Sequence, residues 1–190
     1  MADFKPSRPT TLTGRRFWIG WELASILAWS LGGLTVKLVG GSEEIITTGY
    51  LGILCAAALS GLLQWPLLRH RIDHAGRWAL ASLATAAGLA PLIFGVGLVD
   101  PDAGWVAGVL LFGPSAAFLQ WRVLRGQVAK AGLWIPVSTL GWIGGGLAGD
   151  PLGWPGIGRV YGAGTGFLLL KLWRHPLSDP TTIDSEEEAA

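Results

Sequence analysis

Long apolar stretches dominate this sequence and restrict its fold more than any other feature. A bilayer core of about 30 Å needs about 20 mostly apolar residues in a helix. Only 14% of the residues are charged, against roughly 25% in soluble domains. Six stretches meet or approach the required length, namely Phe17–Val39, Ile45–Leu68, Trp78–Val99, Gly104–Leu124, Leu133–Ala148 and Gly156–Trp173. The sequence therefore predicts an all-α integral membrane protein, a six-helix bundle.

The polar connections between these stretches are short, so we expect neighbouring helices to form hairpins. One transmembrane domain is predicted over residues 17–174. Its three helical hairpins cover roughly 17–68, 78–124 and 133–173. Residues 1–16 hold two prolines and a threonine cluster, and residues 175–190 hold the acidic run Glu186–Glu188. Such compositions predict a disordered N-terminal arm and a disordered acidic tail.

Charged residues in the connections alternate in sign along the chain. Except for Lys37 and Arg159, the 14 basic residues lie in the N-terminal arm, the second and fourth connections and the start of the tail. The other connections carry the acids Glu43, Glu44, Asp100, Asp102 and Asp150. By the positive-inside rule, both termini are expected in the cytoplasm. The chain is then a multi-pass protein of an inner or thylakoid-type membrane.

Tryptophan is unusually frequent, with 11 residues. Most lie near the ends of the apolar stretches, where an indole ring can remain in the headgroup layer. Those near the predicted cytoplasmic ends are Trp18, Trp21, Trp65, Trp78, Trp121, Trp134 and Trp173. We interpret them as an aromatic belt, whereas Trp29 and Trp142 lie near mid-span.

An internal repeat connects the predicted hairpins. A shift of 56 residues, from Gln64 to Gln120, aligns two segments without a gap. The identical pairs include Gln64/Gln120, Trp65/Trp121, Leu68/Leu124, Arg69/Arg125, Trp78/Trp134 and Ser82/Ser138. Trp21 and Ser25 keep the same four-residue spacing, and Leu169 replaces the glutamine in the last hairpin. One hairpin used three times predicts a pseudo-threefold bundle in which the serines bond across helices.

The repeated turn also resembles a known family. Gln-Trp-x-x-Leu-Arg, at 64–69 and 120–125, is followed by Ala-Gly-x-Trp at 75–78 and 131–134. This pattern is similar to that of uncharacterised multi-pass membrane proteins of cyanobacterial and Chloroflexi type. The resemblance covers the central part of the chain and implies its architecture alone, with no activity, cofactor or site residue to carry over.

Glu22 and Arg159 are charged residues within the apolar stretches. A charge at mid-helix costs about 2.5–3.5 kcal/mol on insertion scales, so each is a functional candidate. Counted from Trp18 and Trp173 as markers of the inner boundary, they differ in depth by about 15 Å, which argues against a direct ion pair. We expect Arg159 to extend outward instead, toward acids such as Asp150.

Glu22 is expected to share a layer with two amides. Gln64 and Gln120 each precede an inner-boundary arginine by five residues, which places them at a similar depth. One interpretation is a structural layer of hydrogen bonds between hairpins, each worth about 0.6–2 kcal/mol. The other is a proton or cation site, or the floor of a cavity that faces the cytoplasm.

Glycines recur every four residues in the last hairpin. The positions are Gly141 and Gly145 on its first helix and Gly158, Gly162 and Gly166 on its second. Small residues at this spacing let helix backbones approach closely, within the hairpin or against a partner chain. A permeation groove, or a slot for a flat pigment or lipid, remains the alternative interpretation.

Two prolines fall near mid-span in adjacent predicted helices. Pro91 and Pro114 each leave a backbone carbonyl without its helical partner. Paired breaks of this kind form substrate sites in some transporters, although ordinary kinks are the simpler interpretation.

Several classes of function lack the residues that they need. The net charge of +1 excludes a nucleic-acid binder that depends on bulk charge. His70, His74 and His175 lie at the predicted cytoplasmic boundary, so they offer no base or pigment ligand within the core. The one cysteine, Cys55, cannot form a cysteine-rich metal site. We therefore expect neither an enzyme nor a protein with a cofactor.

Three functions remain at this point. The leading hypothesis is a non-catalytic accessory, assembly or structural subunit in the lipid bilayer that packs against other membrane proteins through the glycine-rich hairpin or the acidic tail. The second is a small-solute or ion transporter or channel that uses the polar layer and the proline breaks. The third is a pigment- or lipid-binding membrane protein. The sequence predicts neither an oligomeric state nor a particular partner.

Overall fold

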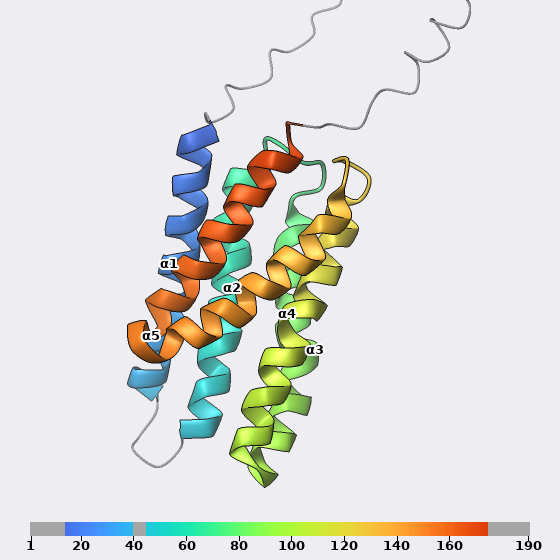
Figure 1. Ribbon diagram of the computed structural model, residues 1–190. Coiled ribbons are helices and arrows are strands. Elements are labelled where there is room, and N and C mark those ends of the chain that lie inside the picture. Colours follow the sequence, from blue (N-terminus) through green and yellow to red (C-terminus); the bar gives the residue numbers. More distant parts are fainter. Residues whose placement is uncertain (1–13, 40–44, 175–190) are drawn as a thin grey trace, which may run out of the picture.

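The computed structural model describes residues 14–39 and 45–174, and the regular elements of these ranges are helices (Figure 1). In chain order they are α1 (Gly14–Val39), α2 (Ile45–Leu68), α3 (Gly76–Val99), α4 (Pro101–Leu124), the short 3-10 helix η1 (Ala131–Leu133) and α5 (Trp134–Leu172). Most of residues 1–16 and all of residues 175–190 lie outside the described part, so the predicted arm and tail stay predictions. Gly14–Arg16, predicted as arm, instead form the first turn of α1.

The helices form a closed ring, which confirms the all-helical bundle. Each of α1 to α4 packs against the next helix, and α5 packs against both α4 and α1. Both described ends of the chain lie at the same end of the bundle (Figure 1), where Gly14 of α1 approaches Leu170 of α5. We call this the basic end, because it also holds the arginine-containing connections at 69–75 and 125–130.

Helix α5 corresponds to the fifth and sixth predicted stretches. It bends at Gly153, whose φ of 66° and ψ of −170° are not helical. Its two arms, 134–152 and 154–172, are each about 28 Å long at 1.5 Å per residue. The prediction of a polar break over 149–155 was therefore wrong, because one residue reverses the chain and helical turns continue to either side of it.

The α5 hairpin is shorter than its neighbours. Trp154, just after the bend, lies against Gly33 of α1 and Gly52 of α2. Gly33 precedes the end of α1 by six residues, so the bend lies about 9 Å short of that end. Figure 1 shows α2, α3 and α4 continuing beyond the bend.

We expect Gly153→Ala to destabilise the bundle by about 1–3 kcal/mol, because only glycine adopts this backbone conformation without strain. The comparison is Gly95→Ala in α3, where an added Cβ would meet nothing within 4 Å. Thermal unfolding of both variants in the same detergent measures the difference. Equal midpoints would show that the bend tolerates a side chain.

The reversal between α3 and α4 needs a single residue. Asp100 is extended, and its N–H donates to the carbonyl of Val96 (2.9 Å), which ends α3. Its carboxylate Oδ1 accepts the N–H of Ala103 (3.1 Å), which caps α4. Pro101 occupies the first helical position, where a missing N–H costs nothing. Helix α4 therefore begins at Pro101 rather than at the predicted Gly104.

Four helical segments are long and apolar enough to cross a membrane: Gly14–Val39, Leu51–Leu68, Gly76–Val99 and Val106–Leu124. The chain is thus a membrane protein with an all-helical fold. The prolines inside α2, α3 and α4 do not interrupt these helices. Pro91 and Pro114, proposed from sequence as midplane breaks, therefore lie within continuous helices.

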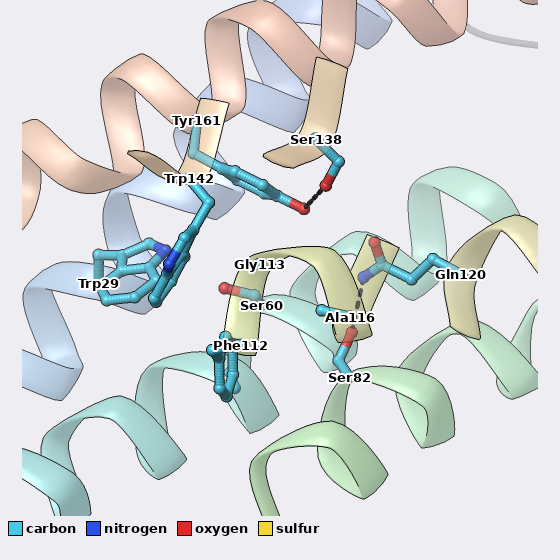
Figure 2. Close-up of a pocket in the computed structure, with 11 residues that line it drawn as sticks. Trp29, Ser60, Ser82, Phe112, Gly113, Ala116, Gln120, Ser138, Trp142 and Tyr161 are labelled. Atoms are coloured by element: carbon cyan, nitrogen blue, oxygen red, sulfur yellow. Dashed lines mark hydrogen bonds between the residues drawn. The ribbon is translucent and has the colours of Figure 1, made fainter. Parts of the chain in front are cut away.

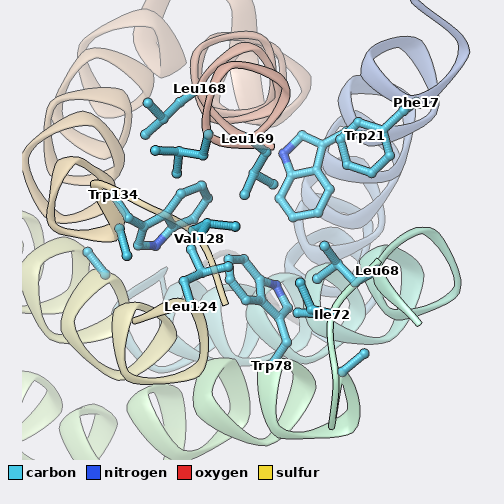
Figure 3. Packing of buried hydrophobic residues seen from close by; sticks show 14 residues of the cluster. Phe17, Trp21, Leu68, Ile72, Trp78, Leu124, Val128, Trp134, Leu168 and Leu169 are labelled. Carbon is cyan, nitrogen blue, oxygen red and sulfur yellow. The ribbon is translucent and has the colours of Figure 1, made fainter. Parts of the chain in front are cut away.

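Two buried clusters fill the ring. The first, near the basic end, surrounds three tryptophans, Trp21, Trp78 and Trp134 (Figure 3). The second, further from the basic end, contains Trp29 and Trp142. The tryptophans of the first cluster are each 0% exposed, so their prediction as belt residues was wrong. Their side chains lie on the inner face of the helices, whereas a belt requires the outer face.

Candidate functional site

A hydrogen-bonded relay joins the first two hairpins. The indole N–H of Trp78 donates to Gln64 Oε1 (3.1 Å), and Gln64 Nε2 donates to Ser25 Oγ (3.1 Å). The Ser25 hydroxyl in turn donates to the backbone carbonyl of Trp21 (2.9 Å). The relay runs from α3 through α2 to α1, and all of its side chains are buried. Each polar group thus has a partner away from water, as a buried group requires.

An equivalent relay occurs 56 to 57 residues later in the chain. Trp134 Nε1 donates to Gln120 Oε1 (3.1 Å), Gln120 Nε2 donates to Ser82 Oγ (3.0 Å), and Ser82 donates to the carbonyl of Trp78 (3.2 Å). This relay joins α5, α4 and α3. The prediction that Ser25 and Ser82 bond across helices is therefore confirmed.

The last hairpin uses different residues for these contacts. Leu169 replaces the glutamine, and Trp21 Nε1 donates instead to Thr165 Oγ1 (3.0 Å). Ser138, the third serine of the pattern, contacts the Tyr161 hydroxyl (3.2 Å), where either oxygen could be the donor. Tyr161 and Thr165 were not identified from the sequence, because neither aligns with the glutamines. These bonds connect α1 to α5 and one arm of α5 to the other.

The connections of the basic end repeat a backbone conformation as well. His74 and Lys130, 56 residues apart, both have a positive φ, of 55° and 58°. Gln127 of the second connection joins it to the first, since its Oε1 accepts the N–H of Asp73 (2.6 Å) and its Nε2 donates to the Asp73 carbonyl (3.2 Å).

Arg71 closes the same end of the bundle. Its guanidinium carbon lies 4.9 Å from the ring centroid of Phe17 and 4.6 Å from that of Trp173. Partial burial between these rings lowers the pKa of Arg71 from its ordinary value, although a guanidinium stays protonated in proteins. The contact ties the connection between α2 and α3 to the start of α1 and the end of α5.

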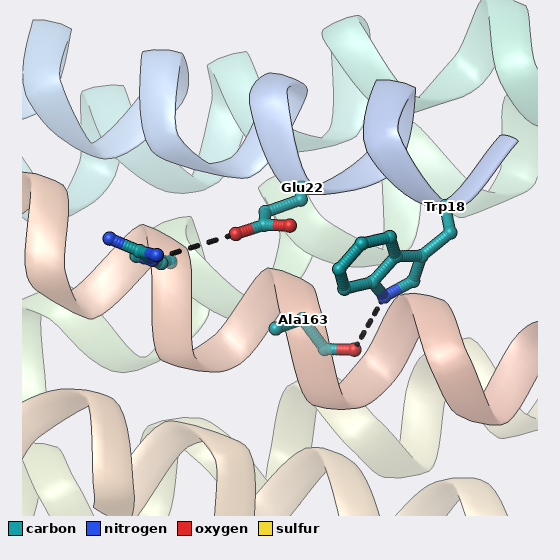
Figure 4. A network of polar contacts seen from close by, with 4 residues as sticks. Trp18, Glu22 and Ala163 are labelled. Atoms are coloured by element: carbon teal, nitrogen blue, oxygen red, sulfur yellow. Dashed lines mark hydrogen bonds and ion pairs between the residues drawn. The ribbon is translucent and has the colours of Figure 1, made fainter. Parts of the chain in front are cut away.

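Glu22 does not share the partners of the two glutamines. Its Oε1 lies 3.7 Å from Nε of Arg159, on the neighbouring arm of α5. Figure 4 shows Glu22 and Trp18 on the side of α1 that faces this arm. Gln64 and Gln120 instead bond to tryptophan and serine side chains. The predicted layer is therefore divided between two buried relays, which hold the glutamines, and an ion pair in which Arg159 is exposed and Glu22 is largely buried.

The expectation that Glu22 and Arg159 lie too far apart was wrong. It placed Trp18 and Trp173 at the same depth, but the Trp18 indole N–H donates to the carbonyl of Ala163 (3.1 Å). Ala163 precedes Trp173 by ten residues, or about 15 Å along the helix, which accounts for the whole discrepancy. Arg159 pairs with Glu22 rather than extending toward Asp150.

The glycines of α5 pack within the chain. A Cβ at Gly158 would lie 2.5 Å from the carbonyl oxygen of Ser25 in α1. Gly162 and Gly166 also face α1, whereas Gly141 and Gly145 face the second arm of α5. These glycine surfaces are therefore covered by helices of the same chain.

A small cavity, partly open to the outside, lies between the helices beside the second relay. Its volume is about 40 Å³, and all five α-helices contribute to its wall. Among the described residues that line it are Ser82, Gln120, Ser138 and Tyr161, together with aromatic rings of the second cluster (Figure 2). Of the three residues of the predicted layer, Gln120 alone is among them.

No cluster of three or more histidine, cysteine, aspartate or glutamate side chains that could hold a metal ion occurs within residues 14–39 and 45–174. In comparisons with known proteins, no family model, curated protein or solved structure matches the chain.

Proposed function

We propose that this protein is a non-catalytic accessory or assembly subunit that docks in the membrane against another membrane protein. The docking face is the outer side of α1 and the second arm of α5 around Arg159, which we call the Arg159 face. Its partner is a transmembrane helix that offers neutral oxygen acceptors, such as side-chain amides or hydroxyls, at the depth of Arg159. The basic end faces the cytoplasm in this proposal, as the positive-inside rule indicates.

The observation that carries the proposal is an exposed arginine halfway along the span. Arg159 follows Gly158, which lies against Ser25. Ser25 is about 16 Å from the start of α1 and about 21 Å from its end at 1.5 Å per residue. The Arg159 side chain is 73% exposed. Neither end of α1 is within reach of one side chain, which argues against extension of Arg159 to the headgroups at those ends.

Glu22 pairs with only one of the three guanidinium nitrogens of Arg159. The ion pair uses Nε, at 3.7 Å, and the Glu22 side chain is 18% exposed. A guanidinium carries five N–H donors, so those on the terminal nitrogens need further acceptors. The pair is already neutral overall, which favours a partner with uncharged oxygens over a second carboxylate. Exposed apolar side chains such as Leu23 and Val160 complete a surface typical of helix packing in lipid.

The test is co-purification of the full chain from its native membrane in mild detergent. We expect a stoichiometric complex with a second membrane protein, and at least a tenfold loss of it in Arg159→Leu, because about 1.4 kcal/mol corresponds to tenfold in affinity. Lys37→Leu is the matched control, since Lys37 is an exposed cation near the end of α1. It should retain the complex.

Native mass spectrometry of the purified samples decides the outcome. A wild-type chain that is monomeric, or that associates only with copies of itself, contradicts the proposal. So does a complex that Arg159→Leu and Lys37→Leu retain equally. Matching thermal unfolding midpoints for the two variants would show that the loss reflects docking and not misfolding.

A further inference from the structure

The cavity beside the second relay is lined by aromatic rings on one side and by polar groups on the other. Rings of Trp29, Phe112 and Trp142 form one side, with centroids of Trp29 and Trp142 5.2 Å apart and those of Phe112 and Trp142 4.8 Å apart. Hydroxyl and amide groups line the rest. Figure 2 shows Tyr161 and Ser138 above the cavity and the Gln120–Ser82 bond beside it. The wall is thus apolar on one side and hydrogen-bonding on the other, as in small-molecule sites.

One residue of this wall, Trp142, has a polar group without a partner among the described residues. Trp142 is 9% exposed, and its indole N–H has no hydrogen bond to any described residue. A buried donor without an acceptor destabilises the fold, because it loses its hydrogen bonds to water. The relays spare Trp78 and Trp134 this cost, because glutamines accept their N–H groups. An acceptor in the cavity would do the same for Trp142.

Size and charge restrict what can enter. A water molecule needs about 10–15 Å³ of free volume in a cavity, so a volume of about 40 Å³ holds about three waters or a solute of similar size. None of the described lining residues carries a charge at neutral pH, since the Tyr161 phenol is protonated there. A bound ion would therefore lack a counter-charge in a low-dielectric interior.

We propose that this cavity binds a small uncharged molecule with a hydrogen-bond acceptor for the Trp142 N–H and with donors or acceptors for Tyr161 and its neighbours. Water and a small neutral amide or alcohol share this chemistry. The site lies where the last hairpin departs from the repeat, since Tyr161 rather than a glutamine contacts the repeat serine Ser138 there. It is separate from the Arg159 face and does not depend on the docking proposal.

The test follows the Trp142 indole signal by NMR. The full chain is labelled with ¹⁵N-tryptophan in lipid nanodiscs, and Trp142→Phe assigns the resonance. Resident water predicts magnetisation transfer from water to the Trp142 N–H in buffer alone. A solute predicts a saturable shift of the same resonance when acetamide or ethylene glycol is added. The absence of both responses would show a dry, unoccupied cavity and overturn the proposal.

Two variants locate the response. Ala116→Val adds volume at a residue that lines the cavity, and Ala87→Val adds the same volume at an exposed position on α3. We expect the response to disappear in the first and to remain in the second. Tyr161→Phe removes one hydroxyl without adding volume and should weaken the response if Ala116→Val does not fold. A response unchanged by both cavity variants would place the bound molecule elsewhere and contradict the assignment.

Discussion

Gly158→Leu is expected to unfold or misassemble the bundle, with a loss of about 3 kcal/mol or more. Its Cβ would lie 2.5 Å from the carbonyl oxygen of Ser25 and 2.8 Å from Cα of Ile26. Both are backbone atoms, so no side-chain rotation relieves the clash and α1 must move away from α5. Overpacking of a core commonly costs about 1–3 kcal/mol, and more when backbone must move.

The matched control lies on the same arm of α5. Gly164 is exposed, and a Cβ there would meet nothing within 4 Å. Gly164→Leu should be neutral or slightly stabilising, because glycine is about 0.8–1 kcal/mol less favourable in a helix than alanine and leucine ranks close to alanine. Denaturation of the two variants in mixed micelles measures the contrast. Equal stabilities would mean that α1 and α5 do not pack at Gly158.

Gln120→Leu is expected to cost about 2–4 kcal/mol, the second largest effect. The change removes the acceptor of the Trp134 N–H and the donor to Ser82. Membrane hydrogen bonds contribute about 0.6–2 kcal/mol each, and Trp134, which is 0% exposed, would keep a buried donor without a partner. Leucine fits this kind of position, since Leu169 replaces the glutamine in the last hairpin.

A double-mutant cycle separates the relay from simple packing. Trp134→Phe removes the donor that Gln120→Leu leaves unpaired, so the double variant should lose less than the sum of the two single variants. A coupling of about 1 kcal/mol or more, measured by the same denaturation, supports the relay. Strict additivity would show that Gln120 and Trp134 act independently.

Helix content and membrane insertion follow directly from local sequence. The apolar stretches correctly predicted both ends of α2 and the C-terminal ends of α1, α3 and α4. The shift of 56 residues pointed to the glutamines and tryptophan donors of both relays before any contact was known. The four-residue spacing of Trp21 and Ser25, which Trp78 and Ser82 repeat, pointed to the serines. The same spacing of 14 residues, from Gln64 to Trp78 and from Gln120 to Trp134, could have revealed the tryptophans as relay donors rather than belt residues.

The sequence could not predict the relative depth of residues on different helices, or whether a side chain lies on the inner or the outer face of the bundle. The distance between Glu22 and Arg159 depended on how far α5 slides along α1, which the Trp18–Ala163 bond and the glycine contacts determine. Tyr161 and Thr165 were missed because the shorter last hairpin changes the alignment of its residues with the repeat. The cavity likewise results from a local departure from the repeat that no motif marks.

The sequence by itself determined that the chain is helical and lies in a membrane, because hydropathy and length act residue by residue along one helix. It also determined which polar residues recur. Only the tertiary structure decided which of them meet, since helix register, tilt and rotation are set by many weak contacts between segments far apart in the chain. For that reason Gln64 and Gln120 became buried connectors between helices, while Arg159 remained exposed at mid-span with Glu22 beside it.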